Sequence, residues 1–197
     1  MRISDSRYAR ERSQLELALR MIAYEARTCT IRTCTGLSDD RIRKIYTTYF
    51  KSEPRINVRR QRGKPPTRIS IYVKNPTHQG ETTTLALLYC DAGLLACRLD
   101  APAPLLLGKS VAYGHRVCQA YDVYCLLHPQ RSICFERGWF LIDALVNGDE
   151  LQFTRCSGCG SVYVHDALTL DDHLCPGCQR RRRGSGNRCS RGRGKPR

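Results

Sequence analysis

The sequence lacks any long run of apolar residues. Its longest apolar stretches, Leu85 to Cys90 and Leu105 to Leu107, fall far short of the roughly 18 residues that a membrane-spanning helix needs. The first residues, Met-Arg-Ile-Ser-Asp-Ser-Arg-Tyr, also lack the apolar core of a secretion signal. These absences exclude a membrane partner and predict a soluble protein of the bacterial cytoplasm, in which its 12 cysteines stay reduced.

Acidic residues and histidines are also scarce, with 18 Asp and Glu and 5 His among 197 residues. They form no pattern that indicates catalysis, and the sequence contains no phosphate-binding glycine loop and no nucleophile motif. We therefore expect that the protein is not an enzyme.

Two cysteine pairs near the C-terminal end carry the strongest chemical signal. Cys156 pairs with Cys159, and Cys175 pairs with Cys178, each with two residues in between. A two-residue spacer lets one tight turn direct two thiolates at a common point, so two such turns can complete a tetrahedral zinc shell. A complete shell leaves no ligand position for water or substrate, which predicts one structural zinc ion per chain.

Two alternatives remain for this region. Each pair can instead be a C-x-x-C redox couple, although no βαβ pattern surrounds them. His165 and His173 lie between the pairs and can replace a thiolate. Since four cysteines already complete the shell, we expect both histidines to be loop residues or hydrogen-bond partners of the ligands.

The positive charge is concentrated in two segments. The formal net charge is +15, with 33 Lys and Arg. Residues 51–74 hold eight of these against Glu53 alone, and residues 179–197 hold nine with no acid. This pattern is typical of a protein that binds nucleic acid, because Lys and Arg displace counterions from phosphates. The alternative is that both segments are only solvated surface.

Helical periodicity dominates the remainder of the chain, and it predicts helices over 7–27, 28–34, 38–50, 81–96, 105–127 and 132–147. Alternating residues predict strands over 151–155 and 161–165, with a further short strand over 69–73. We expect a mainly α fold with five parts: N-terminal helices over 1–50, a basic connector over 51–80, a helical body over 81–150, a zinc-ribbon-like module over 151–179 and a disordered Arg/Gly-rich tail over 180–197.

The N-terminal helices match the pattern of a helix-turn-helix with Gly36 at the turn. Apolar residues take the positions at which the two helices pack: Ile31, Leu37, Ile42 and Ile45. Basic residues of the second helix face outward: Arg41, Arg43 and Lys44. Asp39 and Asp40 favour the helix start but oppose DNA, and Arg32 falls where close packing needs a small residue. A role in the core or in a protein interface is therefore the alternative.

Double-stranded DNA is the leading partner hypothesis. The candidate contacts lie on the second helix, the connector and the tail: Arg41, Arg43, Lys44, Arg59, Arg60, Arg62, Arg180, Arg181, Arg182 and Arg183. The alternative is an RNA-binding zinc-ribbon protein of translation or RNA processing, for which the Arg/Gly-rich tail is equally suitable. A helical body before the ribbon, without an RNP-type aromatic motif or a Gly-x-x-Gly loop, favours DNA.

Taken together, these features resemble the FlhC family of bacterial flagellar transcriptional activators. The resemblance spans roughly residues 10–178. It depends on four parts of the chain: LELALRMI over 15–22, GLS over 36–38 followed by RIRKIY over 41–46, RGW over 137–139 with Leu151-Gln152 downstream, and the cysteine quartet over 156–178. Ile71-Tyr72-Val73 stands where the family usually has a Trp-Phe pair, and the Arg-rich tail after Gln179 has no match in the family.

The resemblance implies that the four cysteines hold one zinc ion. It also implies a hetero-oligomer with FlhD, a small helical protein, in an assembly of two FlhC and four FlhD subunits. Such an assembly binds promoter DNA upstream of flagellar operons and recruits RNA polymerase. The expected function is therefore a cytoplasmic DNA-binding subunit that activates transcription for flagellum biogenesis.

Overall fold

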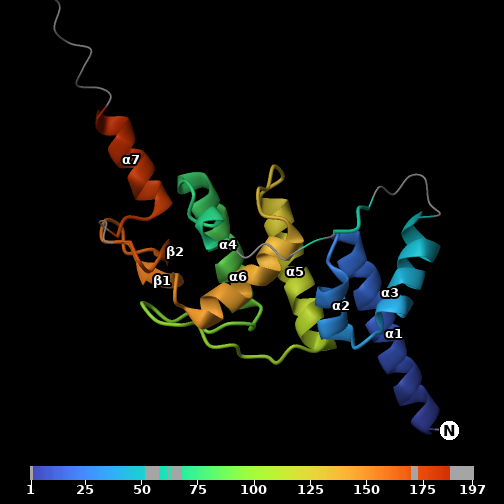
Figure 1. Ribbon diagram of the computed structural model, residues 1–197. Coiled ribbons are helices and arrows are strands. Elements are labelled where there is room, and N and C mark those ends of the chain that lie inside the picture. Colours follow the sequence, from blue (N-terminus) through green and yellow to red (C-terminus); the bar gives the residue numbers. More distant parts are fainter. Residues whose placement is uncertain (1, 52–57, 62, 64–67, 170–172, 187–197) are drawn as a thin grey trace, which may run out of the picture.

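The computed structural model in Figure 1 describes residues 2–51, 58–61, 63, 68–169 and 173–186. These residues form a mainly helical fold with two short strands, which confirms the mainly α part of the expectation. The helices are α1 (Arg2–Ala23), α2 (Thr28–Thr35), α3 (Asp39–Tyr46), α4 (Pro76–Asp91), α5 (Val111–Leu127), α6 (Phe135–Asn147) and α7 (Pro176–Gly186). The strands are β1 (Leu151–Arg155) and β2 (Val162–Asp166), and two short helical turns are η1 (Thr47–Lys51) and η2 (Ile69–Ile71).

The elements follow one another across the molecule. In Figure 1, α1, α2 and α3 lie at one end, α4, α5 and α6 lie in the middle, and the hairpin with α7 lies at the other end. One continuous apolar core joins these parts, since buried residues of α1, α3, α4, α5, α6 and both strands belong to the same cluster. No helix among the described residues has the length and apolar character that crossing a membrane requires.

Local capping explains where most helices begin and end. Ser38 caps α3, Asn75 caps α4 and Ser110 caps α5, because each side-chain oxygen accepts a backbone N–H of the first turn. Gly148 follows α6 with φ 71°, a left-handed conformation that glycine adopts without strain. Helix α1 ends at Ala23, and Glu25, two residues further on, takes φ 59°.

Several expected boundaries are wrong in the middle of the chain. The expected strand over 69–73 is replaced by the 3-10 turn η2, and Tyr72, directly after this turn, is buried and donates to the Arg137 carbonyl. The helix expected over 81–96 begins at Pro76, inside the expected connector, and ends at Asp91. Pro76 fits the first turn because no helical hydrogen bond needs its missing N–H. The helix expected over 105–127 begins at Val111.

The hairpin is anchored on α4. Its strands are antiparallel, with Phe153 opposite Val164, and this pair is buried in the main core. Gln79 of α4 donates to the Val164 carbonyl at 3.0 Å, and the Val164 N–H donates to Thr83 at 3.1 Å. The hairpin is therefore fixed by the helical body and does not depend on its own small apolar cluster.

The C-terminal segment differs from the expected disordered tail. Helix α7 extends to Gly186, so residues 180–186 are helical. Residues 187–197, which the same expectation covers, lie outside the described residues. The second cysteine pair therefore leads directly into a basic helix.

A buried carboxylate joins the middle helices. Glu81 of α4 accepts three hydrogen bonds, from the Tyr124 hydroxyl at 2.6 Å, the Ser132 N–H at 2.8 Å and the Ser132 hydroxyl at 2.9 Å. Burial opposes its ionisation, but the hydrogen bonds from Tyr124 and Ser132 outweigh burial and lower the pKa of Glu81. Glu81 is therefore ionised in the folded protein, and its carboxylate joins α4 to Tyr124 and Ser132.

We expect Glu81→Gln to lower the free energy of unfolding by about 2 kcal/mol, because a neutral amide accepts the hydrogen bonds of Tyr124 and Ser132 less strongly than the carboxylate does. A carboxyl with a lowered folded pKa stabilises the protein at neutral pH, and this contribution is lost as the pH falls through that pKa. Urea unfolding should therefore show a smaller loss of stability on acidification in the variant than in the wild type. Glu150→Gln, at an exposed position, is the control. Equal effects of both substitutions would contradict the prediction.

Candidate metal centre

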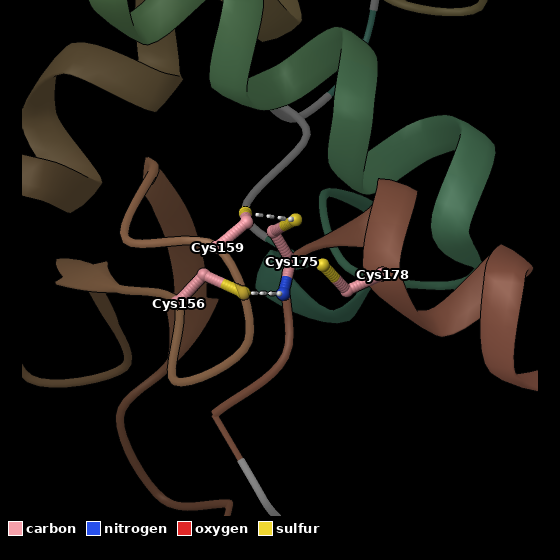
Figure 2. A group of neighbouring side chains, drawn as sticks. All are labelled: Cys156, Cys159, Cys175 and Cys178. Carbon is pink, nitrogen blue, oxygen red and sulfur yellow. Dashed lines mark hydrogen bonds between the residues drawn. The ribbon is translucent and has the colours of Figure 1, made fainter.

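The first cysteine pair lies in the turn of the hairpin. Cys156 follows β1 directly, and its N–H donates to the Ser161 carbonyl at 2.9 Å. The Gly160 N–H donates back to the Cys156 carbonyl at 2.9 Å. Gly160 takes φ 72°, a backbone conformation that is unfavourable for residues with a side chain. This tight turn directs the Cys156 and Cys159 side chains to one side of the hairpin (Figure 2).

The second pair lies at the start of α7. Cys175 precedes Pro176, the first residue of the helix, and Cys178 lies in the first turn. The segment before α7 is tied to the hairpin turn that carries the first cysteine pair, because the Ser157 N–H and hydroxyl both donate to the His173 carbonyl, at 2.8 and 3.1 Å. The Cys175 N–H also donates to the Cys156 sulfur at 3.2 Å.

The four sulfur atoms converge on one point. They all lie within 4.8 Å of one another, and the Cys159 and Cys175 sulfurs are 3.6 Å apart. A disulfide would bring two sulfurs to about 2.05 Å. Four sulfurs around one ion with bonds of about 2.3 Å lie about 3.8 Å apart, which agrees with this spacing. The four cysteines can therefore bind one metal ion, and they would leave it no open position.

Hydrogen bonds at this centre favour thiolates. Those from Ser161, first through its side chain and then through its N–H, lower the pKa of Cys159 to about 6. Burial opposes ionisation of Cys156, but N–H groups of the turn and of Cys175 outweigh it and lower the pKa of Cys156. Burial raises the pKa of Cys175 to about 11. Metal ligands must be deprotonated, so this centre has two ligands already biased toward the binding form.

Arg181 belongs to the centre, although the sequence indicates it only as a DNA contact. Its guanidinium donates to the Cys178 sulfur at 3.2 Å, and this hydrogen bond raises the pKa of Arg181. The two residues are three positions apart on α7, a spacing that places side chains on the same helix face. The positive charge of Arg181 therefore lies beside the centre and would offset part of the negative charge of four thiolates around a metal ion.

The two histidines lie beside the cysteines and not among them. The group of potential ligands in the described chain contains four cysteines and no histidine. The ring centroids of His165 and His173 are 5.2 Å apart, edge to face. His165 is buried, and burial, followed by the charge of His173, lowers the pKa of His165. The expectation that both are accessory residues therefore agrees with the geometry.

The candidate nucleic-acid residues of the N-terminal end lie on a helix pair. Gly36 ends α2 with φ 69°, and α3 follows after the Ser38 cap. All four apolar residues expected to pack the pair are buried: Ile31, Leu37, Ile42 and Ile45. The three basic residues of α3 are exposed: Arg41, Arg43 and Lys44. Arg32 is exposed as well, so it does not obstruct the packing of the two helices.

The basic connector is partly anchored beside this pair. The Glu25 carboxylate accepts the Arg59 N–H at 3.1 Å and the Gln61 amide at 3.0 Å. The Arg60 guanidinium lies 5.6 Å from the centre of the Tyr46 ring, a cation–π contact. The connector residues Arg59 and Arg60 therefore lie close to the end of α3, while Arg62 and the side chain of Arg183 lie outside the described part.

We expect Arg181→Gln to release the bound metal about tenfold faster, the lower end of the range for residues that support metal ligands, because Arg181 is exposed. The rate can be measured with a chromogenic chelator added to the purified metal-bound protein. Arg180→Gln is the matched control, since it removes the same charge from α7 and Arg180 instead donates to Thr77 at 2.9 Å. Equal release rates in the two variants would show that Arg181 does not support the centre.

In comparisons with known proteins, no protein-family model and no curated protein matches the chain.

Proposed function

We propose that the four cysteines bind one zinc ion and that this protein is the DNA-binding subunit of a bacterial transcription activator. Zinc suits the centre because it accepts four thiolates in a tetrahedron and has no redox chemistry that would damage them. A closed shell gives it a structural role. The observation that carries the DNA proposal is the α2–α3 pair, which buries its apolar residues and leaves basic residues of its second helix exposed.

Ion pairs remove the main objection to DNA binding by α3. Asp39 and Asp40 stand at the start of the helix, where their charges would repel phosphates. Arg32 of α2 pairs with Asp39 at 3.0 Å, and Arg43 pairs with Asp40 at 2.7 Å. Exposed pairs of this kind add little stability, but they cancel the local negative field.

Two cations of α3 remain available for phosphates. Arg41 and Lys44 are exposed and form no ion pair with any residue that the structure describes. Arg60, which lies over the Tyr46 ring, adds a further positive charge near the end of the same helix. These residues form the N-terminal basic surface, defined as Arg41, Lys44 and Arg60.

A second basic surface lies at the other end of the molecule. Helix α7 carries Arg180, Arg181 and Arg182 and no acidic residue, and it extends away from the body in Figure 1. The hairpin and α4 to α6 separate it from α3. We propose that the two ends contact different stretches of one duplex, with α3 in the groove and α7 on the backbone.

The resemblance to the FlhC family supports the rest of the proposal. The proposed partner is an FlhD-like small helical protein, the proposed assembly has two chains of this kind with four of the partner, and the proposed targets are flagellar operons in a bacterial cytoplasm. Recruitment of RNA polymerase completes this proposal. A surface that suits a helical partner is the end of α5, where three apolar side chains are exposed at helical spacing: Val123, Leu126 and Leu127.

The DNA proposal predicts that the Arg41→Gln, Lys44→Gln double variant binds duplex DNA less tightly and with a smaller salt dependence. Each lost phosphate contact should reduce the slope of log affinity against log salt by about 0.9. A matched control is Arg98→Gln with Arg116→Gln, which removes two exposed charges from the middle of the molecule. Affinity can be measured by fluorescence anisotropy over a salt series.

The same assay distinguishes the alternative function. At a fixed salt concentration, single-stranded RNA or duplex DNA is added as an unlabelled competitor, at equal phosphate concentration, to displace the labelled duplex from the protein. The proposal predicts that the duplex competes better. Equal salt slopes of the duplex affinity for the α3 variant and its control would contradict the contact of α3 with DNA. Stronger competition by single-stranded RNA would contradict the DNA proposal and favour an RNA-binding protein.

The partner proposal predicts that this protein co-purifies with an FlhD-family protein as a defined complex, and that Leu126→Glu with Leu127→Glu prevents this. A charged side chain in an apolar interface is left without a partner, so binding is lost. Leu168→Glu changes a similarly exposed leucine near the hairpin and should have no effect. Light scattering gives the mass of each complex. A lone chain that binds its promoter duplex with full specificity would overturn the proposal.

A further inference from the structure

Helix α7 is physically continuous with the metal centre. Its first residue, Pro176, lies between the two cysteines of the second pair, and Cys178 is part of its first turn. Both cysteines of the pair can therefore bind one metal ion together only if the first turn of α7 is formed as it is here. Conversely, a bound metal ion holds that first turn in place.

Helix α7 has little capacity to form by itself. It contains 11 residues, fewer than the roughly 12 to 15 that an isolated helix needs. Its sequence, PGCQRRRRGSG, includes three glycines and four successive arginines with no acid. A run of arginines places like charges within one helical turn, and positive charges near the start of a helix oppose its dipole.

Among the described residues, hydrogen bonds tie the first half of α7 to the second cysteine pair and to α4. The Gln179 N–H donates to the Cys175 carbonyl at 3.0 Å, and its amide donates to the Leu174 carbonyl at 2.8 Å. Arg180 reaches Thr77 of α4, and Arg181 reaches the Cys178 sulfur. Three of these four contacts involve the second cysteine pair or the residue before it.

Apolar packing adds little around the centre. The separate cluster at the cysteines contains only three buried residues, Cys156, Tyr163 and Cys175, with Leu174 and Cys178 packed against it. By contrast, Phe153 and Val164 of the hairpin belong to the main core. The hairpin is thus stabilised by the main core, whereas no described residue of α7 belongs to that core, and α7 is held by the centre and by its contact with α4.

From these observations we infer that the metal ion controls whether α7 is folded, and thereby whether the chain presents an ordered arginine surface to duplex DNA. Without metal, the four sulfurs no longer share a bond partner, and the first turn of α7 loses its anchor. The arginines then lie on a flexible segment that must order on binding, which weakens the complex. The choice of duplex DNA as the partner rests on the proposed function, whereas metal-dependent folding of α7 does not.

The test is hydrogen–deuterium exchange on the full-length protein. Exchange is followed in peptides from α7, from the hairpin and from α5, with zinc bound and after treatment with a strong chelator under reducing conditions. We expect the α7 amides to exchange at least about tenfold faster without metal, while the hairpin and α5 stay protected by the core. Protection of α7 should return when zinc is added back.

Cys156→Ser provides the same test without a chelator, since it removes one ligand and leaves the sequence of α7 unchanged. Cys97→Ser, at an exposed cysteine outside the centre, is the matched control. The inference is overturned if α7 stays protected in the metal-free protein. It is also overturned if the hairpin loses protection as much as α7 does, because the metal would then hold the whole module and not α7 in particular.

Binding to a duplex oligonucleotide is measured on the same samples. We expect the metal-free protein to bind at least about tenfold more weakly, since α7 must then fold on the DNA. Equal duplex binding by the two forms, with α7 unfolded in one of them, would overturn the link between the metal and DNA. If neither form binds the duplex while α7 still depends on metal, the proposed function fails and the control of α7 by metal is supported.

Discussion

The contact between the hairpin and α4 is the constraint on which the C-terminal half of the structure depends. Gln79 and Thr83 of α4 bond both backbone groups of Val164, and the adjacent strand residues enter the main core. The first cysteine pair is therefore held in a fixed position by the helical body. The second pair is joined to the first through the Ser157–His173 contacts and the hydrogen bond from the Cys175 N–H to the Cys156 sulfur, and α7 lies against α4. A metal ion bound by all four cysteines would join the two pairs directly.

The arginines of this protein have different roles, although the net charge counts them alike. Arg32 and Arg43 cancel the acids at the start of α3, and Arg60 packs on Tyr46. Arg181 supports a cysteine of the metal centre. Arg41 and Lys44 remain exposed for a partner. A basic composition therefore indicates a polyanion as a partner, whereas the contacts decide which cations can meet it.

Much of the fold follows from local sequence signals. The helices with clear periodicity, the hairpin and the convergence of the four cysteines are predictable, because each depends on residue spacing over a short stretch. The start of α4 at Pro76 and the turn η2 are not, because their shape depends on Tyr72 packing into a distant core. The anchoring of the connector by Glu25 joins residues 34 and 36 positions apart, and no local pattern signals it. Helix α7 is not predictable for a related reason. Its composition disfavours a helix, and contacts at the cysteine centre, which the local sequence does not signal, offset this disadvantage.

We propose that four thiolates of one chain surround one zinc ion and thereby organise the C-terminal end. Zinc K-edge X-ray absorption of the purified full-length protein tests it most directly, because it reports the number, type and distance of the ligand atoms. The account predicts one zinc ion per chain with four sulfur neighbours at about 2.3 Å. Nitrogen or oxygen atoms in the first shell, or a protein that carries no zinc and has its cysteines in disulfides, would contradict it.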